Sequence, residues 1–443
     1  SHRLMINTDT IATMKDIEMK KRGLGIVFLL CAAFGMAQVP APPQKKSILI
    51  TEVTVHIGNG KEIQDGAVGF RDGKIDYVGS TALAPKGYQV VIQETGKHLY
   101  PGFIAVNSTL GLNEISAVRA TRDMDETGEY NPHVRSLIAY NTDSRVTPTV
   151  RANGILMAQV SPQGGRVSGT SSVMMLDGWN WEDAVLKEDD GIHVNWPETT
   201  KWSWETRERA ADPDYEKKVA DLRAFFERAR SYANESKPAY DIRADACKDL
   251  FNGKKRLYVH TDRAVEMTSA IHMAQDLGID NLVIVGGYDA HLITPLLKDR
   301  KVSVMIGRIH GLPTYPEDDV HQNYKLAGIL EKAGILFCLE NSDRMPEMNT
   351  MNLPFNAGTC VAYGLDKRAA ISAITLNPAK ILGIDKRCGS IEMDKDATLF
   401  ISSGDALDMR TNNVVRAFIQ GRDIDLDNFQ KQLNAKYKQK YQG

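Results

Sequence analysis

The sequence predicts an α/β protein: a (β/α)8 TIM-like barrel with a small composite β-sandwich domain built from both chain ends. Two observations lead to this prediction. Apolar runs of strand length alternate with helical patterns through the middle of the chain, and β-rich segments cut by turn signals flank that middle on both sides. About eight such units in roughly 300 residues favour a closed barrel over an open sheet.

A secretory signal is expected at the start of the chain. Basic residues at 20–22 precede an apolar run at 23–37, which ends in a small-x-small pattern. This run is shorter than the ~20 residues that a membrane span needs. We interpret residues 1–37 as a signal peptide with an upstream extension and residues 38–46 as a linker. The expected location is secreted or periplasmic, with no membrane span in the mature chain.

The two β-rich segments lie at residues 47–100 and 384–426. Turn signals at 58–60, 65–66 and 72–73 cut the first segment into a small antiparallel meander. The second segment has the same pattern of short apolar runs separated by turn residues, so we expect the two segments to complete one small domain. The tail at 427–443 is rich in Lys and Gln and is expected to form a solvated helix.

The middle, residues 101–383, is assigned to the barrel, with a charged helical insertion at about 200–250 whose best helical stretch is 208–233. Glycine-rich motifs for dinucleotides or for the phosphates of nucleotides are absent from the sequence. The strands are expected at 103–106, 155–160, 172–176, 257–260, 282–285, 302–306 and 335–339. The helices are expected at 264–278, 290–300, 319–334 and 367–383.

Composition excludes some function classes. The chain has 54 Lys and Arg against 56 Asp and Glu, a formal charge of −2, and this balance argues against nucleic acid as a partner. The four cysteines after the signal have no CxxC spacing, so buried free thiols are expected. All five Trp lie at 179–204 and are expected to form a ligand mouth, a subunit interface or a satellite core.

Chemically capable side chains follow the ends of the predicted strands, where a barrel of this kind builds its site. These residues are Asn107, Thr109, His260, Asp289, His310, Glu340 and Asp343. The glycine-rich segment 162–172 adds Arg166, whose guanidinium suits a substrate carboxylate or another anion. The structural alternatives are a core histidine for His260, a helix cap for Asp343, a solvent-exposed His310 and a plain mobile loop at 162–172.

The chain resembles the amidohydrolase superfamily, in particular its secreted imidazolonepropionase-like branch. The resemblance covers most of the mature chain and rests on GKIDYVGS at 73–80, YPGFIAVNST at 100–109, YVHTD at 258–262 and NSD at 341–343. The longest matching block is AISAITLNPAKILGIDKRCGSIEMDKDATLFI at 370–401. The resemblance implies the barrel fold and hydrolysis of C–N bonds other than ordinary peptide bonds in a small polar substrate.

The resemblance also implies one divalent metal, zinc or another, which activates water. The family holds it with a His-x-His pair and two further histidines, and a strand-eight Asp moves the proton. Here the matching positions are Asn107 and Thr109, His260, about Gly286, and Asp343. Asp343 and His260 are therefore the catalytic and metal-ligand candidates, and Asn107, Thr109, Arg166 and His310 the substrate-binding candidates. Neutral Asn and Thr oxygens argue against metal binding in the family's way.

Three functions stay open at this point. The chain is a hydrolase with a rebuilt site, a catalytically silent homologue that binds a ligand or accompanies an active paralogue, or an assembly module that uses its Trp cluster. The expected partners are accordingly a small-molecule substrate and further subunits, in a homo-oligomer or in a hetero-oligomer with an active paralogue.

Overall fold

The structure is a computed structural model that describes residues 39–307, 309–341 and 346–442. The expected signal segment, Arg308 and the candidate Asp343 lie outside these residues. Contacts divide the chain into Ser1–Val39 and one compact unit, Pro40–Gly443, and the following description concerns that unit. Among the described helices, none combines the length and the apolar character that a membrane crossing demands.

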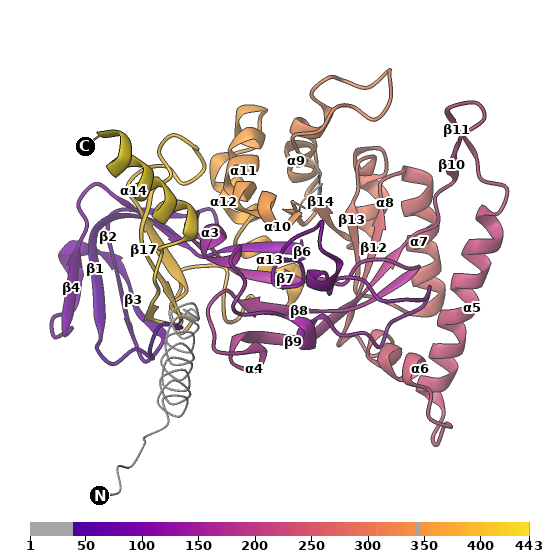
Figure 1. The fold of residues 1–443 in the computed structure, drawn as a ribbon, viewed down its shortest axis with the longest axis horizontal. Coiled ribbons are helices and arrows are strands. Elements are labelled where there is room, and N and C mark those ends of the chain that lie inside the picture. The colour runs from indigo at the N-terminus through magenta and orange to yellow at the C-terminus, as the bar shows by residue number, and fades with distance from the viewer. Residues whose placement is uncertain (1–38, 308, 342–345, 443) are drawn as a thin grey trace, which may run out of the picture. The chain divides into compact units, whose positions relative to one another are not determined.

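Both ends of the compact unit contribute to one eight-stranded sheet, called here the composite sheet (Figure 1). Its order is β18-β17-β16-β5-β1-β2-β3, with β4 paired to β1. The expected meander forms because Asp72 and Gly73 both adopt positive φ, 48° and 78°, in the two-residue turn between β2 and β3. The bounds are β1 (Ile48–His56), β2 (Glu62–Arg71), β3 (Lys74–Ser80), β4 (Val90–Gln93), β5 (His98–Pro101), β16 (Leu399–Ser402), β17 (Val414–Ile419) and β18 (Arg422–Asp423).

The composite sheet has its own apolar core. Ile50, Val55, Phe70, Leu99 and Phe418 are fully buried there, and they come from both ends of the sequence. Hydrogen bonds therefore join the two predicted β-rich segments into one sheet, while a two-layered sandwich and the exact domain boundaries stay predictions.

A second eight-stranded sheet forms the barrel, in the order β15-β14-β13-β12-β9-β8-β7-β6. Hydrogen bonds pair the neighbouring strands from β6 to β15, and the first and last strands meet through side chains. Asn107 at the end of β6 donates an amide hydrogen bond to Glu340, just after β15, at 3.3 Å. The sheet is thus a nearly closed barrel. The bounds are β6 (Phe103–Ser108), β7 (Ile155–Val160), β8 (Val167–Met175), β9 (Val185–Asn195), β12 (Arg256–Thr261), β13 (Leu282–Gly286), β14 (Ser303–Ile306) and β15 (Phe337–Leu339).

The barrel differs from the predicted all-parallel sheet at β8, which runs antiparallel to both β7 and β9. Gly164 and Gly165, both with positive φ, turn the chain directly from β7 into β8 without a helix. Residues 167–172, expected in a glycine-rich loop, therefore belong to a buried strand. Strand β9 was not predicted, because charged residues at 187–190 interrupt its apolar pattern.

Helices cover the outside of the barrel sheet, and the four predicted helical stretches are present. Residues 290–300 and 367–383 are each divided into two short pieces. Helices α7 and α9 end at Gly278 and Gly334, whose left-handed conformation (φ 70° and 73°) stops the helix. The bounds are α2 (Ser136–Ala139), α3 (Thr147–Arg151), α4 (Trp181–Ala184), α7 (Ala264–Leu277), α8 (Thr294–Asp299), α9 (Gln322–Ala333), α10 (Pro346–Asn349), α11 (Leu353–Ala362), α12 (Lys367–Ala373) and α13 (Leu376–Leu382).

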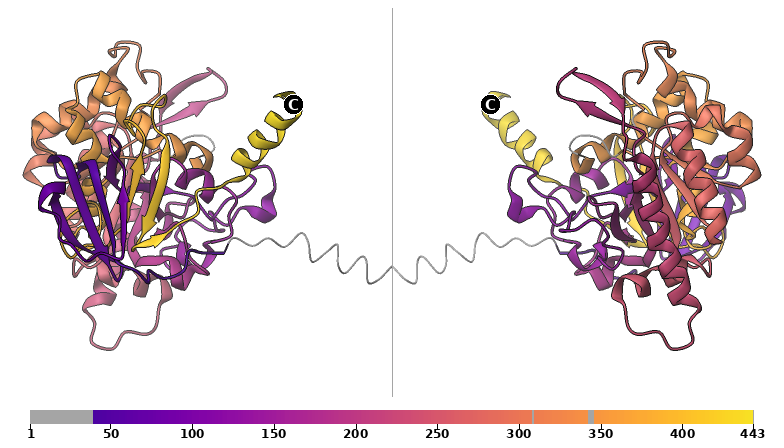
Figure 2. Two further views of the ribbon diagram at one scale, coloured as in Figure 1. Left: turned by 90° about the vertical axis from the view of Figure 1, so that its left-hand side faces the viewer. Right: turned by 90° about the vertical axis from the view of Figure 1, so that its right-hand side faces the viewer.

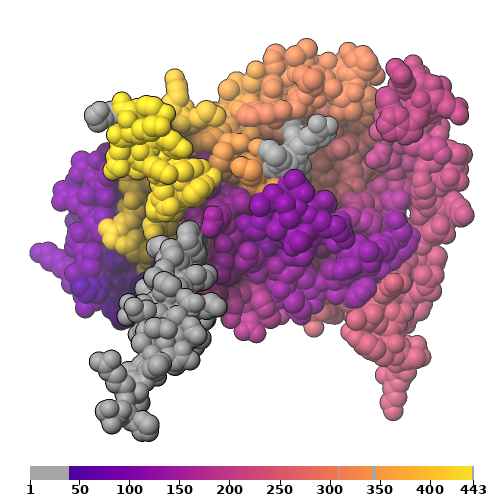
Figure 3. All heavy atoms as spheres, in the orientation of Figure 1, coloured from indigo at the N-terminus to yellow at the C-terminus, as the bar shows by residue number. Residues whose placement is uncertain are grey.

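The charged insertion begins with an antiparallel hairpin of β10 (Thr200–Ser203) and β11 (Glu208–Ala211). The prediction of helix from residue 208 was therefore wrong at its start, and α5 spans Tyr215–Asn234, followed by α6 (Ile242–Cys247). The hairpin stands at the edge of the unit (Figure 3). Its Trp204 is 86% exposed, whereas Trp196 is only 3% exposed, so the five Trp do not form one cluster.

The tail forms helix α14 (Phe429–Gln442), which extends away from the body of the unit (Figure 2). Nearly all of its described side chains are exposed, as expected for a solvated helix. The cysteines at 247, 338, 360 and 388 are buried and free, which confirms the prediction for them.

A buried ion network ties the barrel to strand β18. Asp177 accepts hydrogen bonds from Arg151 Nη1 at 2.8 Å and from Arg422 Nη1 at 2.7 Å. The amide of Ala41 also donates to Asp177, at 3.1 Å. Both side chains of the Arg151–Asp177 pair are 6% exposed, so Asp177 places a negative charge beside two guanidinium groups in the interior.

Replacing Asp177 by Asn should lower the free energy of unfolding by about 3 kcal/mol, because it removes the buried carboxylate that both guanidinium groups contact. Urea unfolding followed by circular dichroism measures this difference. The matched control is Asp408→Asn, which removes a carboxylate paired with an Arg410 side chain that is 86% exposed, and should leave the unfolding midpoint unchanged. Equal midpoints for the two variants would contradict the central role of Asp177.

Candidate active site

The candidate site lies where the parallel barrel strands end at their carboxyl termini. Five side chains from different strands or their ends take part, namely Asn107, Gln159, His193, His260 and Glu340. Hydrogen bonds and ring contacts link them into one continuous network, described below. Four of them are buried, with His260 intermediate in exposure.

The centre of this network is Asp190, a fully buried carboxylate inside the barrel. It accepts hydrogen bonds from Ser171 Oγ at 2.6 Å, from the Tyr258 hydroxyl at 2.6 Å and from Gln159 Nε2 at 3.1 Å. Burial raises the pKa of the Tyr258 phenol well above its usual value, so this hydroxyl stays protonated and donates to Asp190. Three donors from three strands thus offset the cost of burying the carboxylate.

Gln159 connects Asp190 to Asn107 through hydrogen bonds. The backbone amide of Asn107 donates to Gln159 Oε1 at 3.0 Å. Asn107 has φ 49°, a left-handed conformation that Asn tolerates better than most residues, and the β6–β7 register shifts there. This local bend lets the Asn107 side-chain amide reach Glu340 Oε2 at 3.3 Å.

Thr109 contacts a second buried carboxylate, that of Glu347. Its hydroxyl donates to Glu347 Oε2 at 3.4 Å, and Ser116 donates to the other carboxylate oxygen at 3.0 Å. Both Thr109 and Glu347 are buried. The two candidate substrate-binding positions after β6 therefore each face a glutamate.

His260 is paired with a second histidine. His193 Nδ1 and His260 Nε2 are 2.9 Å apart, and the His193 ring stacks on Tyr258 with centroids 4.6 Å apart. Burial lowers the pKa of His260 to about 4, and burial together with the charge of His260 lowers the pKa of His193 well below its usual value. Both imidazoles are accordingly neutral at pH 7, and one donates its ring N–H to the other.

The remaining candidates lie apart from this network. Arg166 Nη1 donates to the carbonyl oxygen of Asn195 at 2.6 Å, which secures the turn into β8. His310 is exposed, and its Nε2 lies 2.6 Å from the Thr359 hydroxyl on α11. Asp289 accepts a hydrogen bond from the first amide of α7, at 3.1 Å from Ala264. The substrate-binding roles of Arg166 and His310 stay predictions, as does a place for Asp289 in a rebuilt site.

Sequence reasoning missed Gln159, Ser171, Asp190, His193 and Glu347. Gln159 is a polar residue inside a run of apolar ones, which is an available signal for an inward-facing group. His193 lies on the unpredicted strand β9, so its place beside His260 was not visible in the sequence.

Among the described residues, the side chains at the family's His-x-His positions are not the histidines that the resemblance implies for a metal centre. Asn107 and Thr109 are neutral, and each donates a hydrogen bond to a glutamate. At Gly286 a Cβ atom would lie 2.6 Å from Asp262 Oδ1, so a histidine there requires the surroundings to shift. Across the described ranges, no three His, Cys, Asp or Glu side chains are grouped to hold a metal ion.

The comparisons with known proteins agree with this architecture. The profile of the Amidohydrolase family matches residues 319–424. An amidohydrolase from Thermotoga maritima is 26% identical, covers 85% of this chain and 99% of its own, and has a TM-score of 0.74. No curated protein matches.

Two more distant structures share the fold alone. A Xaa-Pro dipeptidase with bound methionine has a TM-score of 0.54 at 14% identity and covers 86% of this chain and 100% of its own. An adenosine deaminase from Xanthomonas campestris with bound zinc has a TM-score of 0.51 at 16% identity, covering 90% and 98%. The chain is thus similar to amidohydrolases, through a family match at residues 319–424 and a solved amidohydrolase that aligns along most of its length.

Proposed function

We propose that the protein hydrolyses a C–N bond, other than an ordinary peptide bond, in a small polar substrate at the carboxyl end of the barrel. The observation that supports this proposal is the continuous network from Glu340 through Asn107 and Gln159 to the His193–His260 pair. Such a network holds acceptors and donors in fixed positions around one mouth, which hydrolysis requires.

In this proposal, different side chains activate the water, transfer its proton and orient the substrate. Neutral His260, oriented by His193, accepts a hydrogen bond from the attacking water or donates one to the scissile carbonyl. Asp343 is proposed to take the proton of the water and return it to the leaving nitrogen as the C–N bond breaks, a role that rests on the family resemblance. Asn107 and Thr109 orient the water or the substrate, and Arg166 and His310 are proposed to contact it from the loops.

A divalent metal, which amidohydrolases usually bind, would supply a more acidic water and a polarised carbonyl. The described side chains at positions 107 and 109 donate hydrogen bonds to glutamates and do not fit the role of metal ligands.

Ligand binding without turnover is the second candidate function. It is favoured by one observation, the two neutral side chains at the His-x-His positions, both satisfied by glutamates. In that case the same mouth would retain a small polar ligand, and the protein would act alone or beside an active paralogue.

Export from the cytoplasm, into the periplasm or outside the cell, is part of the proposal. The basic stretch and the apolar run at 20–37 support it. Self-association through the exposed Trp202 and Trp204 is proposed as a separate property of the hairpin. The centroids of these two indole rings are 6.3 Å apart.

Removing either proposed catalytic group should strongly reduce turnover. The assay measures the release of free amine from a panel of N-acyl amino acids and lactams. His260→Ala and Asp343→Asn should each reduce kcat/KM by about 100-fold or more, because each removes a proton-handling group. The control is His272→Ala, which removes an exposed histidine on α7 that has no proposed role in the site. A native chain that cleaves nothing, with or without added divalent metal, would favour ligand binding instead.

Restoring the family's ligands should restore metal binding. We expect the native chain to hold clearly less than one equivalent of zinc after dialysis, and Asn107→His/Thr109→His to hold more, because imidazole nitrogens replace neutral oxygens. Plasma emission spectrometry of both proteins measures this difference. A native chain with near-stoichiometric metal would contradict the assignment of a poorly fitting donor set.

The pH dependence of turnover should report His260. With its pKa at about 4 instead of the ordinary 6.5, the acid limb of kcat/KM attributable to this imidazole should lie near pH 4. Unfolded His260 binds protons more readily, so stability is also lost as pH falls from about 6.5 toward about 4. Rates are therefore compared only where circular dichroism shows folded protein. A limb near pH 6.5 in folded protein would contradict the lowered pKa of His260.

A further inference from the structure

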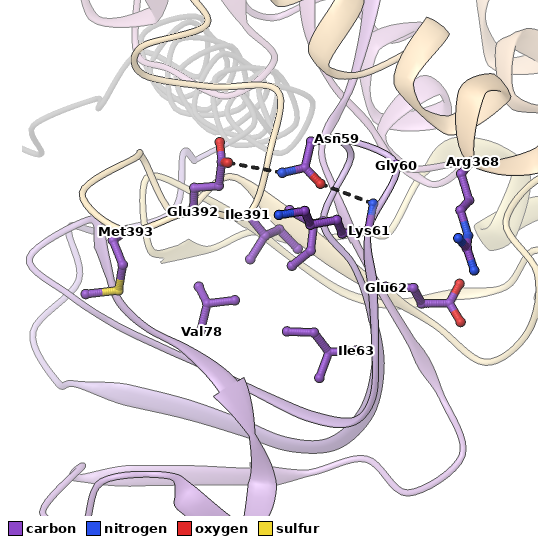
Figure 4. A pocket seen from close by; sticks show the side chains of 11 residues that line it. Asn59, Gly60, Lys61, Glu62, Ile63, Val78, Arg368, Ile391, Glu392 and Met393 are labelled. Carbon is purple, nitrogen blue, oxygen red and sulfur yellow. Dashed lines mark hydrogen bonds between the residues drawn. The ribbon is translucent and has the colours of Figure 1, made fainter.

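A hollow of about 630 Å³ lies between the composite sheet and helix α12 (Figure 4). We call it the basal groove. Ile57 and Ile391, which are buried, and the partly buried Ile63 and Val78 form its apolar lining. Met393, 54% exposed, adds a flexible apolar side chain at its border. The volume is within the usual range for a small-molecule site, ~300–1,000 Å³.

The basal groove lies at the opposite end of the barrel from the candidate active site. A neighbouring hollow of about 580 Å³ shares Asn59, Gly60 and Arg368 with it and continues along residues 334–337. These residues lead into β15, whereas Glu340 follows its other end. The two sites are therefore separated by the length of a barrel strand.

The loop that carries one side of the groove is held in place before any ligand binds. Gly58 has φ 93°, and a Cβ atom there would lie 2.8 Å from the Gly389 carbonyl oxygen. The carbonyl of Gly58 accepts a hydrogen bond from Ser372 Oγ at 2.7 Å. Asn59 links Glu392 to the backbone amide of Lys61, at 3.1 and 3.2 Å (Figure 4). A preformed wall reduces the entropy cost of binding.

The two carboxylates of the groove already have partners. Glu392 pairs with Lys395 at 2.8 Å and accepts from Ser390 at 2.5 Å, and these contacts lower its pKa. Glu62 lies 3.1 Å from His56 Nδ1 and also accepts a hydrogen bond from a glutamine amide.

The two cations of the groove lack such partners. Lys61 and Arg368 are exposed, and within the described part of the chain neither side chain has an ion pair or a hydrogen bond. Figure 4 shows Arg368 extending from α12 at one end of the groove and Lys61 at the Asn59 end. Apolar surface flanked by unpaired positive charge is complementary to a molecule with an apolar tail and an anionic head.

We propose that the basal groove binds an amphipathic carboxylate, with its tail on Ile57, Ile63 and Ile391 and its carboxylate at Lys61 or Arg368. An amine of the same length would meet the unpaired positive charge of Lys61 and Arg368 and lacks this complementarity. The inference does not depend on the hydrolase reaction at the other end of the barrel.

Isothermal titration of the full chain with octanoate tests the proposal. We expect one site, with acetate and octylammonium each about tenfold weaker or undetectable, because each lacks one half of the recognised structure. Lys61→Ala/Arg368→Ala should weaken octanoate by about tenfold or more, since charge-assisted hydrogen bonds are lost. Met393→Glu should weaken it as well, by placing a like charge beside the tail, and needs no change in the buried core.

The matched control is Arg119→Ala/Lys436→Ala, which removes two exposed cations that have no ion pair among the described residues and do not line the groove. It should bind octanoate as the native chain does. Equal affinity of the native chain and Lys61→Ala/Arg368→Ala would place the octanoate elsewhere and overturn the proposal. Equal binding of octanoate and octylammonium, or no binding of octanoate, would overturn it too.

Discussion

The arrangement of the barrel mouth depends on one buried carboxylate, Asp190. A lone carboxylate inside a barrel is costly, and this one is retained because Ser171, Tyr258 and Gln159 all donate to it. These donors are thereby fixed in orientation. Gln159 in turn positions the backbone of Asn107, and Tyr258 provides the ring on which His193 stacks. The hydrogen bonds around Asp190 thus determine the positions of the groups at the barrel mouth.

Much of the fold was predictable because its signals are local. Turns such as Asp72-Gly73 require positive φ, and strand ends such as His260 follow apolar runs. The direction of β8 was not predictable in this way. Its reversal depends on Gly164 and Gly165 making a tight turn in a segment that reads equally well as a loop. Strand β9 could not be predicted from its sequence, because its charged side chains pair with residues distant in the chain, as Asp189 does with Arg135.

The candidate site was predictable only in part, for a related reason. Asn107, Thr109 and His260 stand at strand ends and were found from sequence. Their partners Glu340 and Glu347 follow the last strand, and His193 is contributed by β9, so each pairing joins segments far apart in the chain. Spacing in a sequence carries no information on such contacts, and a single histidine therefore appeared isolated when it is one of a pair.

The side chains at positions 107 and 109 each meet the needs of a buried glutamate. A buried carboxylate needs a positive charge or hydrogen-bond donors. In a metal site the cation meets this need, and histidine nitrogens face the metal. Here Asn107 and Thr109 face the carboxylates and donate to them. Replacing either residue by one that cannot donate would remove a hydrogen bond from its own glutamate, so Asn107 with Glu340 and Thr109 with Glu347 form two donor–acceptor pairs at the mouth.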